Sequence, residues 1–286
     1  MNNTPKKPNK VNKTILKWAG SKVRVMNQLR PHLPKTRYLV EPFAGSCAVM
    51  MNTDYEGYTI ADINDDLINF YQLIDSRSNS PILRDCDQAA LDAWWPKFNT
   101  PKKYYEVRER LNHSKPDSDD RAILFLILNR HGYNGLCRYN RKGEFNVPYG
   151  HYKKAYFPRD EIRAFYQKTQ NTPVDILCLP WQDTLTLVDF EDGVYCDPPY
   201  MGNRDSFTTY HTNGFTDADQ EALAFALKDL NDTQGNPITV SNSLMAKELY
   251  ADLGFTLHEI TAPRSIAGNG NRTPATEIIA VLEVAQ

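Results

Sequence analysis

The sequence predicts an α/β protein in which a Rossmann-like sheet domain is interrupted by a mainly helical insert. Three observations predict this class. Short β-prone runs end at turn residues, residues 81–130 carry helical patterns without strands, and strand signals resume at residue 174. A chain of 286 residues with 41% hydrophobic content is long enough for one sizeable core plus a smaller lobe.

The predicted elements follow in chain order. Before the insert we expect a strand over 38–40, a helix over about 47–52, a strand over 58–61 and a helix over 65–75. In the insert, Asp119 and Asp120 introduce an apolar helix that includes residues 123–128, because acids favour a helix start. Residues 130–152 show no period. Strands are predicted again over 174–178, 194–196, 238–241 and 278–282, with helices between them, one from Thr216 to Leu230.

The tetrapeptide Asp197-Pro198-Pro199-Tyr200 follows the apolar run 194–196 and is expected at the carboxyl end of a buried strand, where open sheets bind ligands. Its prolines stiffen the turn and remove two N–H donors. The Asp197 carboxylate and the Pro198 carbonyl can each accept a hydrogen from an amino group, and the Tyr200 ring offers a stacking face. This pattern predicts a site for an amine on an aromatic ring; a plain strand-ending turn is the alternative.

A carboxylate typical of ribose binding ends the second predicted strand. Asp62 lies about twenty residues beyond Phe43, the spacing at which Rossmann-like folds place an acid on ribose hydroxyls. The turn at Phe43 and Gly45 lets the backbone approach a ligand closely. The sequence contains neither G-x-G-x-x-G nor G-x-x-x-x-G-K-[ST], the glycine-rich patterns that bind phosphates. Their absence favours a nucleoside cofactor without phosphate. S-Adenosylmethionine meets that description; a structural αβ turn is the alternative.

The charge is segregated along the chain although the net charge is only −2. Residues 1–30 and 97–159 each carry a net +8, whereas residues 31–96 carry −6 and residues 160–263 carry −12. Two basic zones on an acidic body are typical of a surface that follows phosphates, if the fold brings them together. Two separate solvated basic surfaces are the alternative.

Several classes of protein are disfavoured by composition. No apolar run approaches the length of a membrane span and no signal segment opens the chain, so we expect a cytoplasmic protein. The cysteines are odd in number and form no CxxC pair, so reduced thiols and no metal are expected. They are Cys47, Cys86, Cys137, Cys178 and Cys196.

Motif blocks throughout the chain resemble one family. They are LKWAGSK (16–22), VEPFAG (40–45), ADIN (61–64), NRHGYNGLCRYN (129–140), GEFNVPYG (143–150), DPPY (197–200) and RSI (264–266). On these blocks the chain is identified as a member of the Dam family of DNA adenine-N6 methyltransferases, which modify the adenine of GATC. One departure is Cys47, which stands where the family's glycine turn usually has a second glycine and is expected to crowd the cofactor's amino-acid moiety.

The resemblance implies the cofactor and its contacts. S-Adenosylmethionine is the implied methyl donor, with Asp62 on its ribose. Trp18 and Lys22 resemble the family's contacts to the methionine part, and Asp197 is expected next to both the cofactor and the target base. Phe43 and Gly45 complete the set of expected cofactor-binding residues.

The resemblance also implies a target-recognition domain over residues 72–157, within a catalytic domain formed by 13–71 and 158–286; residues 1–12 are expected to be a flexible tail. Arg138 resembles the family's reader of a guanine, whose O6 and N7 match a planar guanidinium. Lys17 resembles a second guanine contact, reaching from the catalytic domain. The other expected DNA contacts are Tyr133 in the gap left by the flipped adenine, Asn134 at a phosphate or orphan base, Leu136 and Pro148 at thymine methyls, and Asn140.

The implied reaction is base flipping followed by direct, in-line methyl transfer to adenine N6, held by Asp197, Pro198, Pro199 and Tyr200. The implied partner is duplex DNA containing GATC, and a monomer is expected from the family. Three alternatives stay open: a cytosine-N4 DNA methyltransferase, an RNA methyltransferase, and a GATC-binding protein with impaired catalysis. Host strand marking and protection of mobile-element DNA are equally compatible with the sequence.

Overall fold

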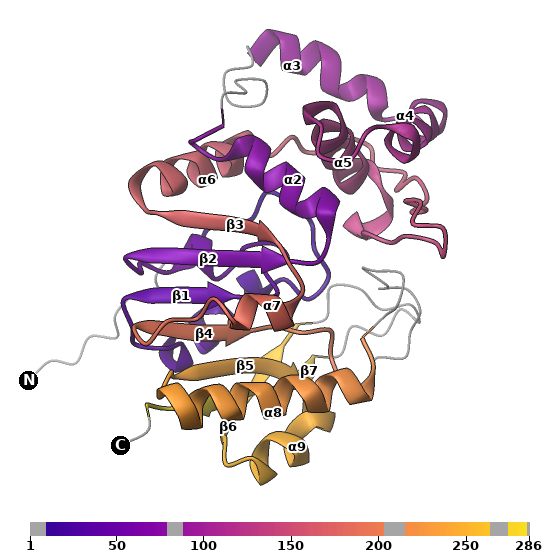
Figure 1. The fold of residues 1–286 in the computed structure, drawn as a ribbon. Coiled ribbons are helices and arrows are strands. Elements are labelled where there is room, and N and C mark those ends of the chain that lie inside the picture. The colour runs from indigo at the N-terminus through magenta and orange to yellow at the C-terminus, as the bar shows by residue number, and fades with distance from the viewer. Residues whose placement is uncertain (1–9, 79–87, 203–214, 264–273, 285–286) are drawn as a thin grey trace, which may run out of the picture.

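A single mixed sheet forms the centre of the protein. The computed structural model describes residues 10–78, 88–202, 215–263 and 274–284 (Figure 1). Within these ranges seven strands follow the spatial order β3-β2-β1-β4-β5-β7-β6. They are β1 (Tyr38–Glu41), β2 (Gly57–Asp62), β3 (Val174–Cys178), β4 (Asp192–Cys196), β5 (Ile238–Ser243), β6 (Thr256–Ala262) and β7 (Ala275–Leu282). The predicted α/β class is confirmed, and the motif block at 264–266 lies outside the described residues.

The order of the strands determines where a ligand can bind. Strands β1 to β5 run parallel to one another, whereas β7 runs antiparallel between β5 and β6. Strand β1 pairs with β2 on one side and with β4 on the other, so the direction of winding reverses between β1 and β4. The carboxyl ends of strands at such a switch point flank the binding crevice of an open α/β sheet. The turn after β1 and the tetrapeptide after β4 therefore lie at the same edge.

Strand β6 is a strand that the sequence analysis did not predict. It lies at the edge of the sheet beside β7, and most of its residues are exposed or half-buried. An edge strand covered on one face needs few apolar residues, so its sequence lacks the continuous apolar run of the central strands. In β4, by contrast, all five residues are buried.

Side-chain caps mark the starts of three of the described helices. Asn64, Ser118 and Thr216 cap the N-termini of α2, α5 and α8 with their side chains. Helix α8 continues past the predicted end at Leu230 and stops at Gly235, whose φ of +79° suits glycine. The α-helices are α1 (Met26–Leu29), α2 (Asp65–Ile74), α3 (Gln88–Trp94), α4 (Pro101–His113), α5 (Asp119–His131), α6 (Arg159–Asn171), α7 (Trp181–Leu185), α8 (Asp217–Gln234) and α9 (Lys247–Asp252). None of these described helices is both long and apolar enough to cross a bilayer.

The helix predicted over residues 47–52 is wrong. Only a 3-10 turn, η3 (Met50–Asn52), forms there. The reason is the backbone of Cys47, whose φ of +56° is in the left-handed region and cannot start a right-handed helix. Other 3-10 turns are η1 (Lys22–Arg24), η2 (Arg30–His32), η4 (Trp95–Phe98), η5 (Tyr133–Gly135) and η7 (Leu244–Ala246).

The helices of the insert form a group of their own. In Figure 1, α3, α4 and α5 gather beyond the β3 edge of the sheet, while α8 and α9 lie near β5. Helix α5 packs against both α4 and α2, so the insert is joined to the sheet domain mainly through α2. Helix α2 runs to Ile74, past the expected boundary at residue 71. Asn12, which lies within the expected tail, exchanges hydrogen bonds with Asn52 of the sheet domain.

Candidate active site

An ion pair joins the N-terminal segment to the tetrapeptide after β4. Lys22 in η1 is only 4% exposed, and its Nζ lies 2.7 Å from Asp197 Oδ2. The same ammonium donates to the Gly20 carbonyl at 2.6 Å and lies 5.0 Å from the centroid of the Tyr200 ring. Lys22 thus contacts both side chains of the tetrapeptide that sequence reasoning selected.

The second oxygen of Asp197 is available to a ligand. Oδ1 is buried and has no hydrogen-bond partner among the described residues. Burial raises the pKa of Asp197 to about 6, Lys22 opposes this shift, and Glu277 adds to it. An ionised Asp197 therefore presents one carboxylate oxygen with an unmet capacity to accept a hydrogen.

Side chains from α8 and β5 hold the turn that follows. The Gln220 amide donates to the Pro199 carbonyl, and its oxygen accepts from Asn242 Nδ2 at 2.9 Å. Asn242 also accepts the Met201 N–H at 3.1 Å, and Ser243 Oγ donates to the Met201 carbonyl at 2.8 Å. Pro198 is buried, whereas Pro199 is exposed. The turn is fixed on its outer side, so Asp197 and Tyr200 keep their relative position.

Tyr200 is anchored through its hydroxyl group. It donates to Glu277 Oε2 at 2.8 Å, from the antiparallel strand β7. A stacking ring whose hydroxyl is tied to the sheet has little freedom to rotate. Sequence reasoning did not select Glu277, because a glutamate on a strand has no local signature of this role.

The turn after β1 and the end of β2 form the other half of the site. The Gly45 N–H donates to Asp62 Oδ2 at 3.0 Å, and the Asn64 N–H donates to Asp62 Oδ1 at 3.0 Å. Gly45 has φ +46°, and a Cβ there would lie 2.9 Å from Trp18 Nε1. The indole and the turn therefore approach each other as closely as only glycine allows. Burial raises the pKa of Asp62, while its backbone hydrogen bonds lower it.

Two further residues of this turn, Phe43 and Cys47, have side chains that pack against other parts of the protein. The Phe43 ring is partly buried and meets Phe215 edge-on at 5.8 Å between centroids. Cys47 is fully buried in the core. Its thiol thus lies inside the core, a position that argues against the expected crowding of a cofactor.

Lys17 makes its polar contacts with residues of the insert, although it precedes the sheet domain's first strand in the chain. Its N–H donates to Asn129 Oδ1 at 2.9 Å, and Asn129 Nδ2 donates back to the Lys17 carbonyl at 2.7 Å. The ammonium lies 3.8 Å from the centroid of the Tyr152 ring and donates to the Arg130 carbonyl at 3.3 Å. Burial and then Arg130 lower the pKa of Lys17 to about 8. Asn129, which sequence reasoning did not select, joins the backbone of Lys17 to helix α5.

The loop after α5 brings three predicted DNA contacts together at the surface. The Tyr133 side chain is 51% exposed, and its N–H donates to the Pro148 carbonyl at 2.8 Å. Asn134 and Pro148 are also exposed. Asn134 has φ +53°, a conformation that asparagine tolerates better than most residues. Leu136, by contrast, is buried in the core, with 5% exposure.

A tight hairpin over residues 138–146 carries the remaining predicted contacts. Arg138 Nε donates to Asn146 Oδ1 at 2.7 Å, and Arg138 Nη2 donates to the Asn146 carbonyl at 3.2 Å. Asn140 stabilises the turn, since its Oδ1 accepts the N–H groups of Lys142 and Glu144 and its Nδ2 donates to Glu144. The half-buried Arg138 is thus held in one orientation, and much of the polar capacity of Asn140 is used within the turn.

Comparison with known proteins bears directly on this arrangement. A family model described as D12 class N6 adenine-specific DNA methyltransferase matches residues 18–266, a span that includes Trp18, Asp62, the insert and the tetrapeptide. The chain belongs to this family. The resemblance drawn from the sequence motifs is confirmed, and the enzyme class is DNA (adenine-N6)-methyltransferase.

Named relatives of this D12-class enzyme match over nearly the whole chain. The retron Ec67 DNA adenine methylase of Escherichia coli is 47% identical over 274 residues, which are 94% of this chain and 90% of the relative. The DNA adenine methylase of E. coli K12 is 42% identical over 277 residues, 95% of this chain and 96% of the relative. That of Serratia marcescens is 40% identical, over 95% of this chain and 99% of the relative.

The family assignment favours adenine N6 over the cytosine-N4 alternative. Within the described part of this D12-class chain, no group of three or more His, Cys, Asp or Glu residues is arranged to hold a metal. The site residues that sequence reasoning missed, Glu277 and Asn129, are ordinary polar residues whose role depends on a distant partner.

Proposed function

We propose that the enzyme methylates adenine N6 within duplex GATC, using S-adenosylmethionine, by base flipping and direct in-line transfer. The observation that carries the proposal is the buried Oδ1 of Asp197, which lies beside the Tyr200 ring and has no hydrogen-bond partner within the described part of the chain. An exocyclic amino group supplies the missing donor, and a planar base supplies a partner for the ring.

We propose that the cofactor binds between the turn after β1 and the end of β2. Asp62 accepts from ribose hydroxyls, and Gly45, Phe43 and Trp18 frame the rest of the molecule. Two features fit a nucleoside that carries a charged amino-acid moiety: the close approach of Gly45 to Trp18, and the acidic side chains Asp62 and Asp197 at one sheet edge. When bound, S-adenosylmethionine supplies an electrophilic methyl group.

The residues of the chain orient the nucleophile. Adenine N6 is a weak nucleophile because its lone pair is delocalised into the ring. Hydrogen bonds from N6 to Asp197 Oδ1 and to the Pro198 carbonyl favour a pyramidal nitrogen, and the carboxylate stabilises the positive charge that grows on N6. Lys22 keeps Asp197 ionised by pairing with Oδ2. Tyr200 stacks on the base, and Pro199 stiffens the turn.

We propose that residues 72–157 read the target and that residues 13–71 and 158–286 perform catalysis. The separate group formed by α3, α4 and α5 supports this division (Figure 1). Arg138 and Lys17 are assigned to guanines, Tyr133 to the gap left by the adenine, Asn134 to a phosphate or orphan base, and Leu136, Pro148 and Asn140 to neighbouring contacts. The burial of Leu136 favours a supporting role for that residue. We further propose a monomer.

The decisive assay is transfer of radiolabelled methyl from S-adenosylmethionine to duplexes with and without GATC, followed by nucleoside analysis. We expect N6-methyladenine in GATC duplexes alone. Label on cytosine N4 or on RNA would support the corresponding alternative enzyme. Specific retention of GATC duplexes without any transfer would instead indicate a DNA-binding protein with impaired catalysis.

A further inference from the structure

The hairpin over residues 138–146 is attached to the protein by its inward-facing side chains. Tyr139 and Phe145 face each other across an antiparallel bridge, and the Asn146 N–H donates to the Arg138 carbonyl at 3.0 Å. The Tyr139 ring meets the Phe145 ring edge-on at 5.7 Å. Because neighbouring residues on a strand point to opposite sides, Tyr139 faces inward while Arg138 faces outward.

The hydroxyl group of Tyr139 reaches the sheet domain. It donates to Asp66 Oδ2 at 2.6 Å, and the Asp66 side chain is completely buried in the first turn of α2. A short hydrogen bond to a buried carboxylate is among the stronger kinds in proteins. This bond therefore ties the hairpin to the helix that starts just after the proposed ribose-binding Asp62.

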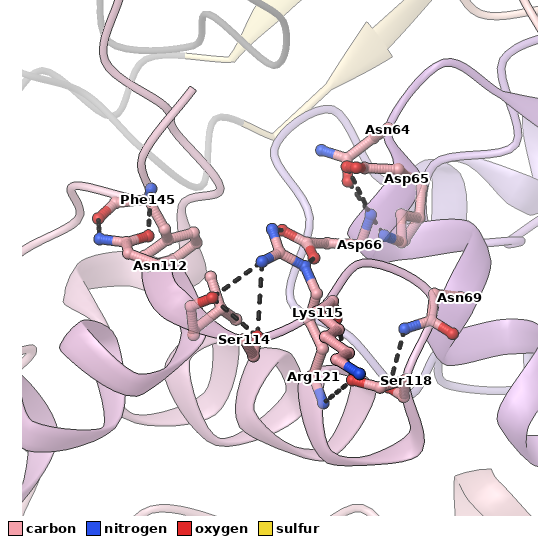
Figure 2. Close-up of polar contacts among 12 residues, drawn as sticks. Asn64, Asp65, Asp66, Asn69, Asn112, Ser114, Lys115, Ser118, Arg121 and Phe145 are labelled. Carbon is pink, nitrogen blue, oxygen red and sulfur yellow. Dashed lines mark hydrogen bonds and ion pairs between the residues drawn. The ribbon is translucent and has the colours of Figure 1, made fainter. Parts of the chain in front are cut away.

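Asp66 is itself held in place by the insert, as Figure 2 shows. Arg121 donates to both carboxylate oxygens, at 2.5 and 3.1 Å, and to the Leu111 carbonyl at 2.8 Å. Asn112 pairs with both backbone groups of Phe145, at 2.8 and 3.2 Å. Asp66 from α2, Asn112 from α4 and Arg121 from α5 thus together support the hairpin. We call these three residues the mount.

The outward-facing guanidinium depends on this mount. Two of its five donors are used on Asn146, which leaves donors for a ligand. A bidentate contact to a base requires the fork to be held at a defined angle. Any tilt of the hairpin changes that angle, although no residue of the mount itself needs to touch the base.

We infer that Tyr139, through its bond to Asp66, is a positioning residue that determines specificity at the base pair read by Arg138. This inference rests on the proposed function, in which Arg138 reads a guanine. Asp66 and Arg121 fix the point of attachment, and Tyr139 transmits its position to the hairpin.

The test uses Tyr139→Phe, which removes one hydroxyl, and measures kcat/KM on duplexes that carry a single unmethylated target adenine. One duplex is GATC, and in two others one or the other G·C pair is replaced by A·T. Arg138→Ala first identifies the pair that Arg138 reads. Tyr55→Phe is the matched control, because its hydroxyl makes a comparable bond to the Pro34 carbonyl at 2.6 Å, far from the hairpin.

We expect Tyr139→Phe to lower discrimination about tenfold at the pair identified by Arg138→Ala and to leave discrimination at the other pair unchanged. Tyr55→Phe should leave discrimination at both pairs unchanged. Asp66→Asn, which also breaks the buried ion pair with Arg121, should lower discrimination at the same pair at least as much. Equal loss at both pairs, or an unchanged ratio in a folded Tyr139→Phe protein, overturns the inference. If Arg138→Ala itself leaves discrimination intact, the assignment of Arg138 in the proposed function fails instead, and the inference fails with it.

Discussion

The Lys22 ammonium lies 2.7 Å from one oxygen of Asp197, while the other oxygen has no hydrogen-bond partner among the residues that the structure describes. The ion pair therefore does two things at once. It favours the ionised carboxylate, and it directs the free oxygen toward the proposed position of the base. Glu277 acts in the opposite electrostatic sense on Asp197 while it holds the Tyr200 hydroxyl.

Removing the charge of Asp197 should reduce turnover. We expect Asp197→Asn to lower kcat by about 10²–10³-fold, because the carboxylate stabilises charge that develops on N6 during transfer. Single-turnover methylation measures this step. Asp192→Asn, at the opposite end of β4, is the matched control and should keep nearly full turnover. Full turnover by Asp197→Asn would exclude the assigned role.

The fall of kcat/KM at acidic pH, the acid limb of the pH profile, should follow the protonation of Asp197. Its pKa is raised to about 6, so kcat/KM should fall as the pH drops through this value and the carboxylate is protonated. Lys22→Gln removes a nearby cation and should move the limb to higher pH. Glu277→Gln removes a nearby anion and should move it to lower pH. Shifts in the same direction for both variants would contradict this electrostatic account.

Lys17 should make DNA binding sensitive to alkaline pH. Its pKa is lowered to about 8, so its charge is lost as the pH rises from 7 to 9. We expect the duplex affinity to fall by roughly threefold to tenfold over this range in fluorescence-anisotropy titrations, because one contact to the duplex loses its charge. Lys17→Arg, which stays charged, should remove the pH dependence. An identical pH profile for both proteins would speak against a contact by Lys17.

Glu41 should lower stability at neutral and alkaline pH. Burial raises its pKa from an ordinary 4.5 to about 8, and its Oε1 has no partner among the described residues. Between these values the folded protein keeps a proton that the unfolded chain releases, so stability falls as pH rises. Glu41→Gln should raise Tm by about 2–5 °C at pH 8, with a smaller gain at pH 5. The exposed Glu221→Gln serves as control; equal gains at both pH values would refute the assignment.

At position 47, a glycine variant should be at least as stable as an alanine variant, which is the reverse of the usual order. A left-handed backbone costs a non-glycine residue about 1–2 kcal/mol, and both cysteine and alanine carry that cost at φ +56°. Cys47→Gly relieves it, so urea unfolding should find Cys47→Gly at least as stable as Cys47→Ala. A glycine variant less stable by the ordinary ~0.5–1 kcal/mol would contradict this reading. The KM for S-adenosylmethionine should change less than about twofold, because the thiol lies in the core.

Local patterns were sufficient for much of the fold. The central strands are largely buried on both faces, so their apolar runs identify them, and Asp119 and Asp120 mark the start of α5. The helix over 47–52 was wrong because the φ of Cys47 is imposed by the turn. Strand β6 was missed because an edge strand owes its place to β7 rather than to its own apolar content.

The sequence by itself determined the candidate site residues, because Asp62 and Asp197-Pro198-Pro199-Tyr200 follow strands and their side chains suit particular ligand groups. Only the tertiary structure decided which distant residues hold them. Glu277 contacts Tyr200, Asn129 fixes Lys17, and Asp66 anchors Tyr139. Polar side chains such as these are common on any strand or helix, and a hydrogen bond between residues far apart in the chain leaves no periodic trace in the sequence.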